Sequence, residues 1–313
     1  MSQQVRPVIA IMGPTASGKS AAAFAAAERF ECEIISVDSA QVYRRMDIGT
    51  AKPSAEQRER VPHHLLDIRE PYETYSAADF VADAHVAVAQ VWSRGHVPLL
   101  TGGTMLYFRA LLHGLSALPS ADPVRRRELD ALAGRIGWEA MHRRLAEVDP
   151  AAAARIHPND PQRIQRALEI YEVTGKTWTQ WCELGTAQAA PFFVSRFVLA
   201  PQRREWLHAR IAERFDQMLA QGLVDEVARL RDEGRLGLEK PSMRAVGYRQ
   251  IWQYLEGSMS YSDARMRAIM ATRQLAKRQF TWLRRERDAV WFDSEQPGTL
   301  DALLYALDGV IRR

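Results

Sequence analysis

A glycine-rich segment near the start of the chain constrains the fold more than any other feature. It consists of Gly13-Pro14-Thr15-Ala16-Ser17-Gly18-Lys19-Ser20, which fits the pattern G-x-x-x-x-G-K-[ST]. The apolar run 8–12 precedes it, and the alanine-rich stretch 21–28 follows it. A buried strand, a glycine loop and a helix are the context in which such a loop binds phosphate. We therefore expect backbone N–H groups to surround a diphosphate at a helix start, rather than a simple turn.

Two side chains of this phosphate loop (13–20) are suited to bind the phosphate compound or its metal ion. Lys19 adds a positive charge to the ring of backbone donors. The hydroxyl of Ser20 is placed to reach a phosphate-bound Mg²⁺ ion. The sequence therefore predicts Mg²⁺ as a cofactor held with the phosphate compound.

Composition restricts the class of protein without identifying it. The 313 residues are 47% hydrophobic and 26% charged, as in ordinary globular proteins. A net charge of +4 permits a polyanionic partner without requiring one. Cys32 and Cys182 lie far apart and form no C-x-x-C pair, so neither a disulfide framework nor a zinc site is indicated. With no signal peptide and no apolar stretch long enough to cross a bilayer, we expect a cytoplasmic protein with no membrane partner.

Strand and helix patterns alternate along much of the chain. Strands are expected over 8–12, 32–38, 97–101, 192–199 and 289–292. Helices are expected over 76–92, 206–230 and 263–287. The alternation predicts an α/β fold of the phosphate-loop type, with a parallel sheet flanked by helices.

The middle of the chain departs from this alternation. From 124 to about 175 every segment has a helical pattern, at 124–133, 138–148, 151–157 and 161–174. The last has Asp160 as its N-cap, Pro161 at its first position and Gly175 just beyond its end. We therefore expect a core from 1–120 and 191–313, interrupted by an all-helical insertion domain at 121–190.

An acidic residue ends the second expected strand but not the third. Asp38 follows the strand at 32–38 and precedes the polar run 39–43, whereas the strand at 97–101 ends in Thr101. The carboxyl ends of neighbouring parallel strands open onto one crevice, so Asp38, Thr101 and the phosphate loop are expected to share it. Asp38 is suited to accept a proton from a nucleophile there. A role as a turn or N-cap residue is the alternative.

Seven segments, in order along nearly the whole chain, resemble the bacterial tRNA dimethylallyltransferases, also called tRNA isopentenyltransferases. They are 13–20, 37–43, 46–53, 102–107, 157–163, 244–250 and 272–279. A phosphate loop alone occurs in very many families, but the ordered set is specific. The C-x-x-C spacing of the zinc finger found in eukaryotic relatives does not occur in this sequence.

The resemblance implies transfer of a prenyl group. The donor is dimethylallyl diphosphate, and the acceptor is N6 of the adenosine on the 3′ side of the anticodon, tRNA position thirty-seven. The substrates are tRNAs reading codons that start with U, and the products are N6-isopentenyladenosine and diphosphate. The phosphate loop with Lys19 and Arg214 then holds the leaving group. Asp38 takes the proton from N6, and the Thr104 hydroxyl fixes the adenine or the diphosphate; a helix N-cap is the alternative role of Thr104, and the two roles are compatible.

A base inside the anticodon loop must be flipped out to react, which requires an RNA-facing surface. Six basic residues against one acid, Glu286, lie between Arg273 and Arg287. A solvated helix face is the alternative, and for Phe280 and Trp282 we expect core packing. The resemblance implies tRNA contacts at Arg126, 162–166 and 244–249. The full set of expected tRNA contacts is Asp38, Ser39, Ala40, Gln41, Thr104, Arg126, Gln162, Arg163, Ile164, Gln165, Arg166, Arg244, Ala245, Val246, Gly247, Tyr248, Arg249, Lys277 and Arg278.

Several alternatives stay open from the sequence. Arg210 and Arg214 lie one helical turn apart, and they either clamp diphosphate, stack on the flipped base or form a salt-bridged surface pair. The activity alternatives are a small-molecule kinase, an isopentenyltransferase acting on free adenine nucleotides, and a non-catalytic RNA-binding module. The resemblance implies a monomer.

Overall fold

The computed structural model describes residues 7–116, 118–185 and 190–312. The chain divides into two compact units. The first comprises Met1–Ala110 with Pro191–Arg313, and the second comprises Leu111–Ala190. The second unit therefore starts at Leu111, before the position 121 expected for the insertion. Each unit has its own core and is described by itself.

The first unit is built on a six-stranded sheet in the order β3-β2-β4-β1-β5-β6. All neighbouring strands pair in parallel, which confirms the predicted class. The strands are β1 Val8–Met12, β2 Cys32–Val37, β3 His63–His64, β4 Val97–Gly102, β5 Val194–Leu199 and β6 Val290–Phe292. The short strand β3 was not expected, because two residues give no alternating pattern to detect.

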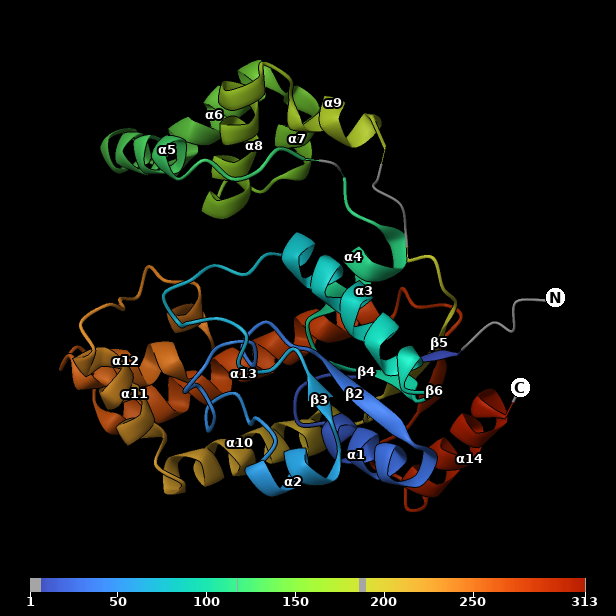
Figure 1. Ribbon diagram of the computed structural model, residues 1–313. Helices are drawn as coiled ribbons and strands as arrows, with labels where there is room; N and C mark the ends of the chain where they lie inside the picture. Colours follow the sequence, from blue (N-terminus) through green and yellow to red (C-terminus); the bar gives the residue numbers. More distant parts are fainter. Residues whose placement is uncertain (1–6, 117, 186–189, 313) are drawn as a thin grey trace. The chain divides into compact units, whose positions relative to one another are not determined.

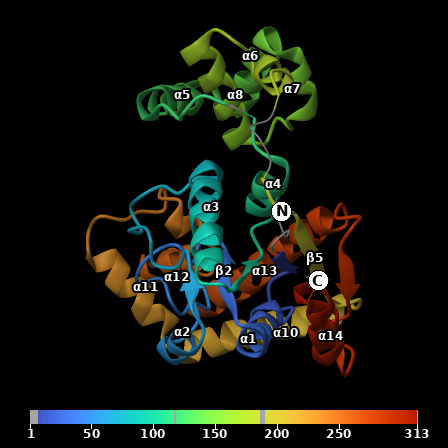
Figure 2. The ribbon, with the colours of Figure 1, turned by 45° about the vertical axis from the view of Figure 1, so that its right-hand side comes forward.

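Helices flank both faces of this sheet, with α3 on one face and α1 and α14 on the other (Figures 1 and 2). Ile9 and Ile11 of β1 pack in one cluster with Ala23 of α1 and Leu303 of α14. All five residues of β1 are buried, and because alternate residues of a strand point to opposite faces, both faces of this strand are covered. The helices of this unit are α1 Lys19–Phe30, α2 Ala55–Arg60, α3 Ala77–Ser93, α10 Arg204–Ala220, α11 Leu223–Asp232, α12 Tyr248–Leu255, α13 Tyr261–Leu283, α14 Thr299–Ile311, and a 3-10 turn at Ser242–Arg244. Helix α4, Met105–His113, crosses the boundary between the units.

The helix expected over 206–230 is wrong as a single element. It consists of α10 and α11, which are separated at Gly222. Gly222 has a φ of 98°, in the left-handed region that interrupts a right-handed helix. The two helices share one apolar pattern because both face the same core, which is why the break is hard to detect from hydrophobic spacing.

A buried carboxylate organises the second core of this unit, where α10–α13 pack against the segment after β2. Glu226 of α11 is 4% exposed and accepts hydrogen bonds from the backbone N–H groups of Asp47, Ile48 and Gly49, at 2.9, 2.8 and 3.2 Å. It also accepts one from the Tyr248 hydroxyl at 2.5 Å. Glu226 therefore fixes a loop that lacks regular structure of its own.

Replacing Tyr248 with phenylalanine is expected to destabilise the fold by about 1.5–3 kcal/mol, the usual range for a buried hydrogen bond to a charged group. The ring still fills its site, so the loss reports the hydroxyl alone. Urea unfolding measures it. Tyr305→Phe is the matched control because Tyr305 is 83% exposed. Equal midpoints for the two variants would contradict the assigned role of the bond.

Within the described part of the second unit, the regular elements are helices. Its helices are α5 Pro123–Ile136, α6 Trp138–Val148, α7 Pro150–Arg155, α8 Pro161–Thr174 and α9 Trp178–Glu183. The predicted caps of α8 are confirmed, since the Asp160 side chain accepts from the N–H of Arg163 and Gly175 has a φ of 70°. Leu129, Met141, Leu145 and other side chains form a core separate from those of the first unit.

Candidate active site

The sheet register brings three chain segments together at one edge. Met12 of β1 pairs with Gly102 of β4, which pairs with Val37 of β2. The phosphate loop, Gly103 and Asp38 therefore leave the sheet side by side. They line one cavity of about 750 Å³ that lies within the first unit, together with Thr101. The shared crevice expected from the sequence is confirmed by this lining.

The phosphate loop is packed tightly against β5. A Cβ atom on Gly13 would lie 2.3 Å from the carbonyl oxygen of Leu199, so only glycine fits there. Gly18 has a φ of 89°, and α1 begins at the next residue. The loop thus ends at a helix N-terminus, where backbone N–H groups and the helix dipole favour an anion.

Two of the cations that line this cavity, Lys19 and Arg214, interact with the charge of Asp38. Lys19 is 8% exposed, and its Nζ donates to the carbonyl oxygen of Pro14 at 3.1 Å. The pKa of Lys19 is lowered to about 8, first by burial and then by the charge of Arg214, while the Asp38 carboxylate opposes the shift. Burial also lowers the pKa of Arg214, again opposed by Asp38. Two positive charges near one carboxylate, all lining the cavity, form a site for a strongly negative ligand.

The arginines of α10 have different partners. Arg210 donates from Nε to the carbonyl oxygen of Ala16 at 3.2 Å, and its guanidinium lies 4.9 Å from the centre of the Trp206 ring. Arg214 lines the cavity and has no hydrogen bond or ion pair within the described residues. Arg210 therefore stabilises the phosphate loop through the Ala16 carbonyl. Of these two arginines, Arg214 has its guanidinium available to a ligand.

Asp38 forms a tight turn in which one of its oxygens is occupied. Its Oδ1 accepts from the N–H groups of Ala40 and Gln41, at 2.9 and 3.4 Å. Oδ2 has no hydrogen-bond partner in the part of the chain that the structure describes. The turn and the proton-accepting role, which were alternatives from the sequence, are thus compatible, because they use different oxygens.

Thr104 links the two loops beside Asp38. Its Oγ1 accepts from the N–H of Ser39 at 3.0 Å and lies 3.3 Å from the Ser39 hydroxyl. Its backbone carbonyl accepts from the N–H of Tyr107 at the start of α4. The side chain thus ties the turn after β4 to the turn after β2.

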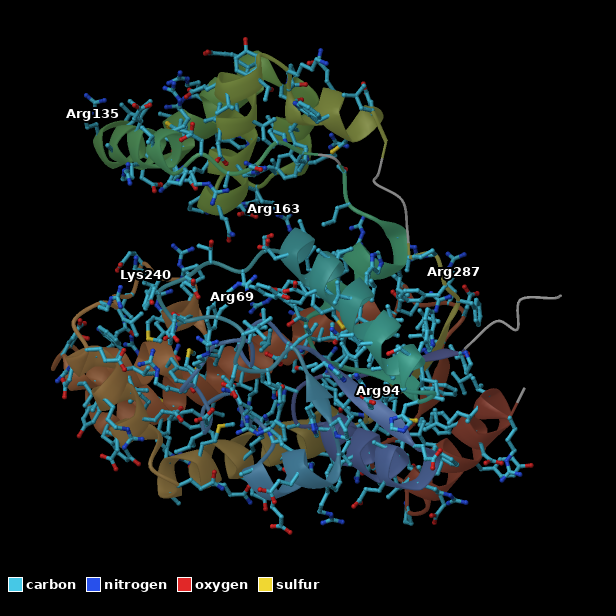
Figure 3. The ribbon with its side chains drawn as sticks, viewed as in Figure 1. Arg69, Arg94, Arg135, Arg163, Lys240 and Arg287 are labelled. Atoms are coloured by element: carbon cyan, nitrogen blue, oxygen red, sulfur yellow. The ribbon has the colours of Figure 1, made fainter. Side chains whose placement is uncertain are left out.

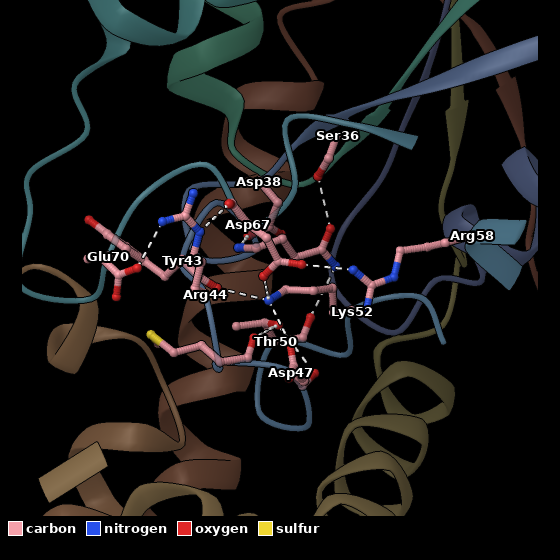
Figure 4. Close-up of polar contacts among 12 residues, drawn as sticks. Ser36, Asp38, Tyr43, Arg44, Asp47, Thr50, Lys52, Arg58, Asp67 and Glu70 are labelled. Atoms are coloured by element: carbon pink, nitrogen blue, oxygen red, sulfur yellow. Dashed lines mark hydrogen bonds and ion pairs between the residues drawn. The ribbon is translucent and has the colours of Figure 1, made fainter. Parts of the chain in front are cut away.

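The segment 46–53 forms another part of the cavity wall and is held from inside by Lys52 (Figure 4). The Lys52 Nζ donates to the Tyr43 carbonyl at 2.8 Å and pairs with Asp47 and Asp67, each at 2.6 Å. The amide of Gln41 donates to the carbonyls of the same segment. These contacts connect the segment to Tyr43, Gln41 and Asp67, although it has no helix or strand.

The IPP transferase family profile matches residues 41–286 of this chain. A protein of Xanthomonas axonopodis pv. citri named tRNA dimethylallyltransferase is 57% identical over 302 residues. The aligned part covers 95% of this chain and 92% of that protein. The chain belongs to the tRNA dimethylallyltransferase family.

Two solved structures resemble the chain over nearly its full length. The tRNA isopentenylpyrophosphate transferase of Bacillus halodurans matches with a TM-score of 0.71 and 37% identity, covering 98% of this chain and 97% of its own. A eukaryotic dimethylallyltransferase acting on tRNA matches with a TM-score of 0.80 and 27% identity, covering 98% and 80%. The phosphate-loop fold and the helical unit are thus found in other dimethylallyltransferases.

The tRNA contacts expected over 244–249 divide into two groups in this dimethylallyltransferase fold. Arg244, Ala245 and Val246 line the cavity, and Arg249 is exposed. Tyr248 is fully buried in the second core, and Gly247 is buried beside it. A tRNA contact through the Tyr248 side chain does not fit this burial, because its hydroxyl is bound to Glu226. Tyr248 supports the cavity wall from behind.

The sequence left two interpretations of the basic helix α13 open, an RNA-binding surface and a solvated helix face. Lys277 and Arg278 are exposed, and Arg278 also lines the cavity. Phe280 packs against the second core, as expected. Trp282 instead lines the cavity, with the guanidinium of Arg109 5.5 Å from its ring centre, so core packing does not describe it fully.

Arg126 and Arg166 of the helical unit converge on one buried acid. Glu169 is 1% exposed and accepts from Arg126 at 3.1 Å and from Arg166 at 2.8 Å. Both cations are therefore held in place while remaining partly exposed. The pair Arg166–Glu169 has the i,i+3 spacing of a helix and could be predicted from the sequence, whereas the bond to Arg126 on α5 could not, because it joins two helices.

The other expected contacts of this unit lie near the start of α8. Arg163 projects from that end of the helix (Figure 3), and Gln162 is exposed beside it. Gln165 donates to Asp130 at 2.5 Å. Ile164 is 0% exposed and belongs to the core of the unit, so its side chain is not available to RNA.

Among the described residues, no group of three or more histidine, cysteine, aspartate or glutamate side chains is arranged to hold a metal ion. Within the same residues, no helix has the length and apolar character needed to cross a membrane.

Proposed function

We propose that this chain transfers the dimethylallyl group of dimethylallyl diphosphate to N6 of the adenosine at position thirty-seven of tRNA. The observation that carries the proposal is the single cavity in which Asp38 faces Lys19 and Arg214. Family membership supports the same reaction. By analogy with the family, the substrates are tRNAs reading codons that start with U, and a monomer acts in the cytoplasm, where tRNA is found.

The cations stabilise the leaving group. As the bond between the prenyl carbon and oxygen breaks, negative charge builds on the diphosphate. The amides of the phosphate loop, Lys19 and Arg214 face that charge in a buried site, where electrostatic stabilisation is strongest. Carbon is the atom transferred, which fits the absence of an acidic residue at the end of β4.

The residues present fit a Mg²⁺ ion bound through substrate phosphate. The exposed Ser20 hydroxyl lines the cavity at the end of the phosphate loop, and Mg²⁺ commonly uses only one or two protein oxygens beside water and phosphate. When bound, the ion would neutralise diphosphate charge.

Asp38 acts as the base. The N6 lone pair forms the new bond to the prenyl carbon, and the N6 proton passes to Asp38 through Oδ2. Thr104 holds the turn that follows Asp38 through its bond to Ser39, and it lines the cavity, where its hydroxyl would fix the adenine or the diphosphate. This arrangement activates an amine whose lone pair is delocalised into the ring.

A transfer assay tests the proposal. The protein and Mg²⁺ are incubated with labelled dimethylallyl diphosphate, and separately with labelled ATP, each with unmodified tRNA, AMP or no acceptor. We expect label to pass from the prenyl donor to tRNA. Prenylation of AMP alone would instead indicate an enzyme of free nucleotides. Phosphoryl transfer from ATP alone would indicate a kinase, and no transfer would indicate a binding module.

Lys277 and Arg278 are proposed to bind the tRNA backbone. Replacing either with glutamine should weaken tRNA binding and reduce the slope of log affinity against log salt by about one per lost phosphate contact. Binding titrations at several salt concentrations measure the slope. Arg29→Gln is the control, because Arg29 is exposed on α1 and does not line the cavity. An unchanged slope in the Lys277 and Arg278 variants removes this part of α13 from the interface.

A further inference from the structure

Gln279 of α13 connects the two loops that surround the proposed diphosphate site. Its side chain is 6% exposed and lines the cavity. Its Oε1 accepts from the N–H of Thr15 in the phosphate loop at 2.9 Å. Its Nε2 donates to the carbonyl oxygen of Gly103, just before Thr104, at 2.7 Å. One amide thus bridges segments that are far apart in the sequence.

The chemistry of the two partners fixes the orientation of this amide. A backbone N–H can only donate and a carbonyl oxygen can only accept, so Oε1 must face Thr15 and Nε2 must face Gly103. A carboxylate at position 279 can accept but cannot donate, and a thioether does neither well. Glutamine is the side chain of this length that satisfies both loops at once.

Gly103 provides independent evidence that the contact is close. A Cβ atom there would lie 2.4 Å from Nε2 of Gln279 and 3.6 Å from Nζ of Lys19. The Gln279 amide, the Gly103 backbone and the Lys19 ammonium therefore meet at one point beside the cavity. A small shift of the amide would move the turn that carries Thr104 relative to the loop that carries Lys19.

We propose that Gln279 is a positioning residue that holds the phosphate loop at a fixed distance from the turn carrying Thr104. It touches no reacting atom. Through Thr15 it acts on the donor side of the cavity, and through Gly103 it acts on the turn that Thr104 ties to the Asp38 loop. The inference rests on the proposed function. The distance between the two loops matters because the prenyl donor and the adenine acceptor must be aligned for transfer.

Gln279→Met removes both hydrogen bonds and changes the volume little. We expect kcat to fall by about 10–100-fold, the scale of a misplacement near 1 Å, while KM for dimethylallyl diphosphate changes by only about threefold or less. The melting temperature should fall, because two buried hydrogen bonds are lost, but the variant should be folded at the assay temperature and its tRNA affinity should stay close to that of the unaltered protein. Gln90→Met is the matched control, because Gln90 is exposed on α3.

Gln279→Glu separates positioning from a general packing role. The carboxylate keeps the bond from Thr15, loses the bond to Gly103 and puts a negative charge near Lys19. Affinity for inorganic diphosphate, measured by calorimetry, should therefore fall. As the pH is lowered toward the ordinary pKa of glutamate, the protonated acid can donate to Gly103 again, and activity relative to the unaltered protein should rise.

Three results would overturn the inference. They are an unchanged kcat in Gln279→Met, a loss of activity that matches a loss of folding and tRNA affinity, and a pH-independent activity ratio for Gln279→Glu. Failure of the unaltered protein to prenylate tRNA would instead overturn the proposed function. The diphosphate titration does not depend on transfer, so it separates the two failures.

Discussion

Replacing Asp38 with asparagine will lower kcat for prenyl transfer to tRNA by about 10²–10⁴, the usual scale for a lost general base. Asparagine keeps an oxygen that can accept from Ala40 and Gln41, so the turn should persist. What is lost is the ability to take a proton from N6. Single-turnover assays with labelled donor measure the chemical step directly.

Binding controls decide whether that loss is chemical. The affinity of Asp38→Asn for tRNA should be close to that of the unaltered protein. Asp301→Asn on α14 removes an exposed carboxylate outside the cavity and should have unaltered kcat. If Asp38→Asn retains full turnover, the base lies elsewhere.

Replacing Lys19 with methionine is expected to lower kcat/KM for dimethylallyl diphosphate by about 10²–10³, since a buried charge that meets the leaving group contributes several kcal/mol. Arg214 remains and preserves part of the site. Steady-state assays at saturating tRNA measure the change. Lys176→Met, an exposed lysine of the helical unit, is the control. A control-like value for Lys19→Met would show that Arg214 and the backbone amides suffice.

The pH dependence follows from the same lysine. In the free protein Lys19 has a pKa lowered to about 8, so it is charged below that pH and neutral above it. We expect kcat/KM for the donor to fall as the pH rises through about 8, and this limb should be absent in Lys19→Met. A limb of equal size in both proteins would assign it to another group.

The free energy of unfolding should instead rise with pH, over the range between the folded pKa of Lys19 and its ordinary pKa. The folded pKa of Lys19 is about 8, whereas its ordinary value is 10.5. Between these values the unfolded chain binds more protons than the folded chain, so the free energy of unfolding rises with pH. The burial penalty of the charged form is complete below about pH 8 and disappears above the ordinary value. Urea unfolding across this range, with Lys19→Met as reference, measures the contribution.

Much of the fold could be predicted because its signals are local. The apolar run 8–12, the glycine pattern and the caps at Asp160 and Gly175 each specify structure within a few residues. Helices α12 and α14 were not expected, although apolar residues at helical spacing mark both of them, as at Leu303, Leu304 and Leu307 of α14. The single helix at 206–230 was wrong because Gly222 interrupts one continuous apolar face.

The candidate site was predictable where it follows from strand ends. Asp38, Thr101 and the phosphate loop meet because parallel strands bring their carboxyl ends to one edge. The roles of Gln279 and Glu226 could not be predicted, because each binds backbone groups of distant loops. Nearly every residue type has the same backbone N–H and C=O groups, so the residue type at the partner's position does not indicate such a bond.

The sequence by itself determined the strand–loop–helix unit at the phosphate loop, the acid at Asp38 and the helical character of the second unit. Only the tertiary structure decided which side chains reach the cavity. It placed Arg214 there and Arg210 on the loop backbone, and it buried Tyr248 and Ile164 in two cores. The physical reason is range. Local patterns record what neighbouring residues do together, whereas burial and hydrogen bonding depend on residues that only folding brings into contact.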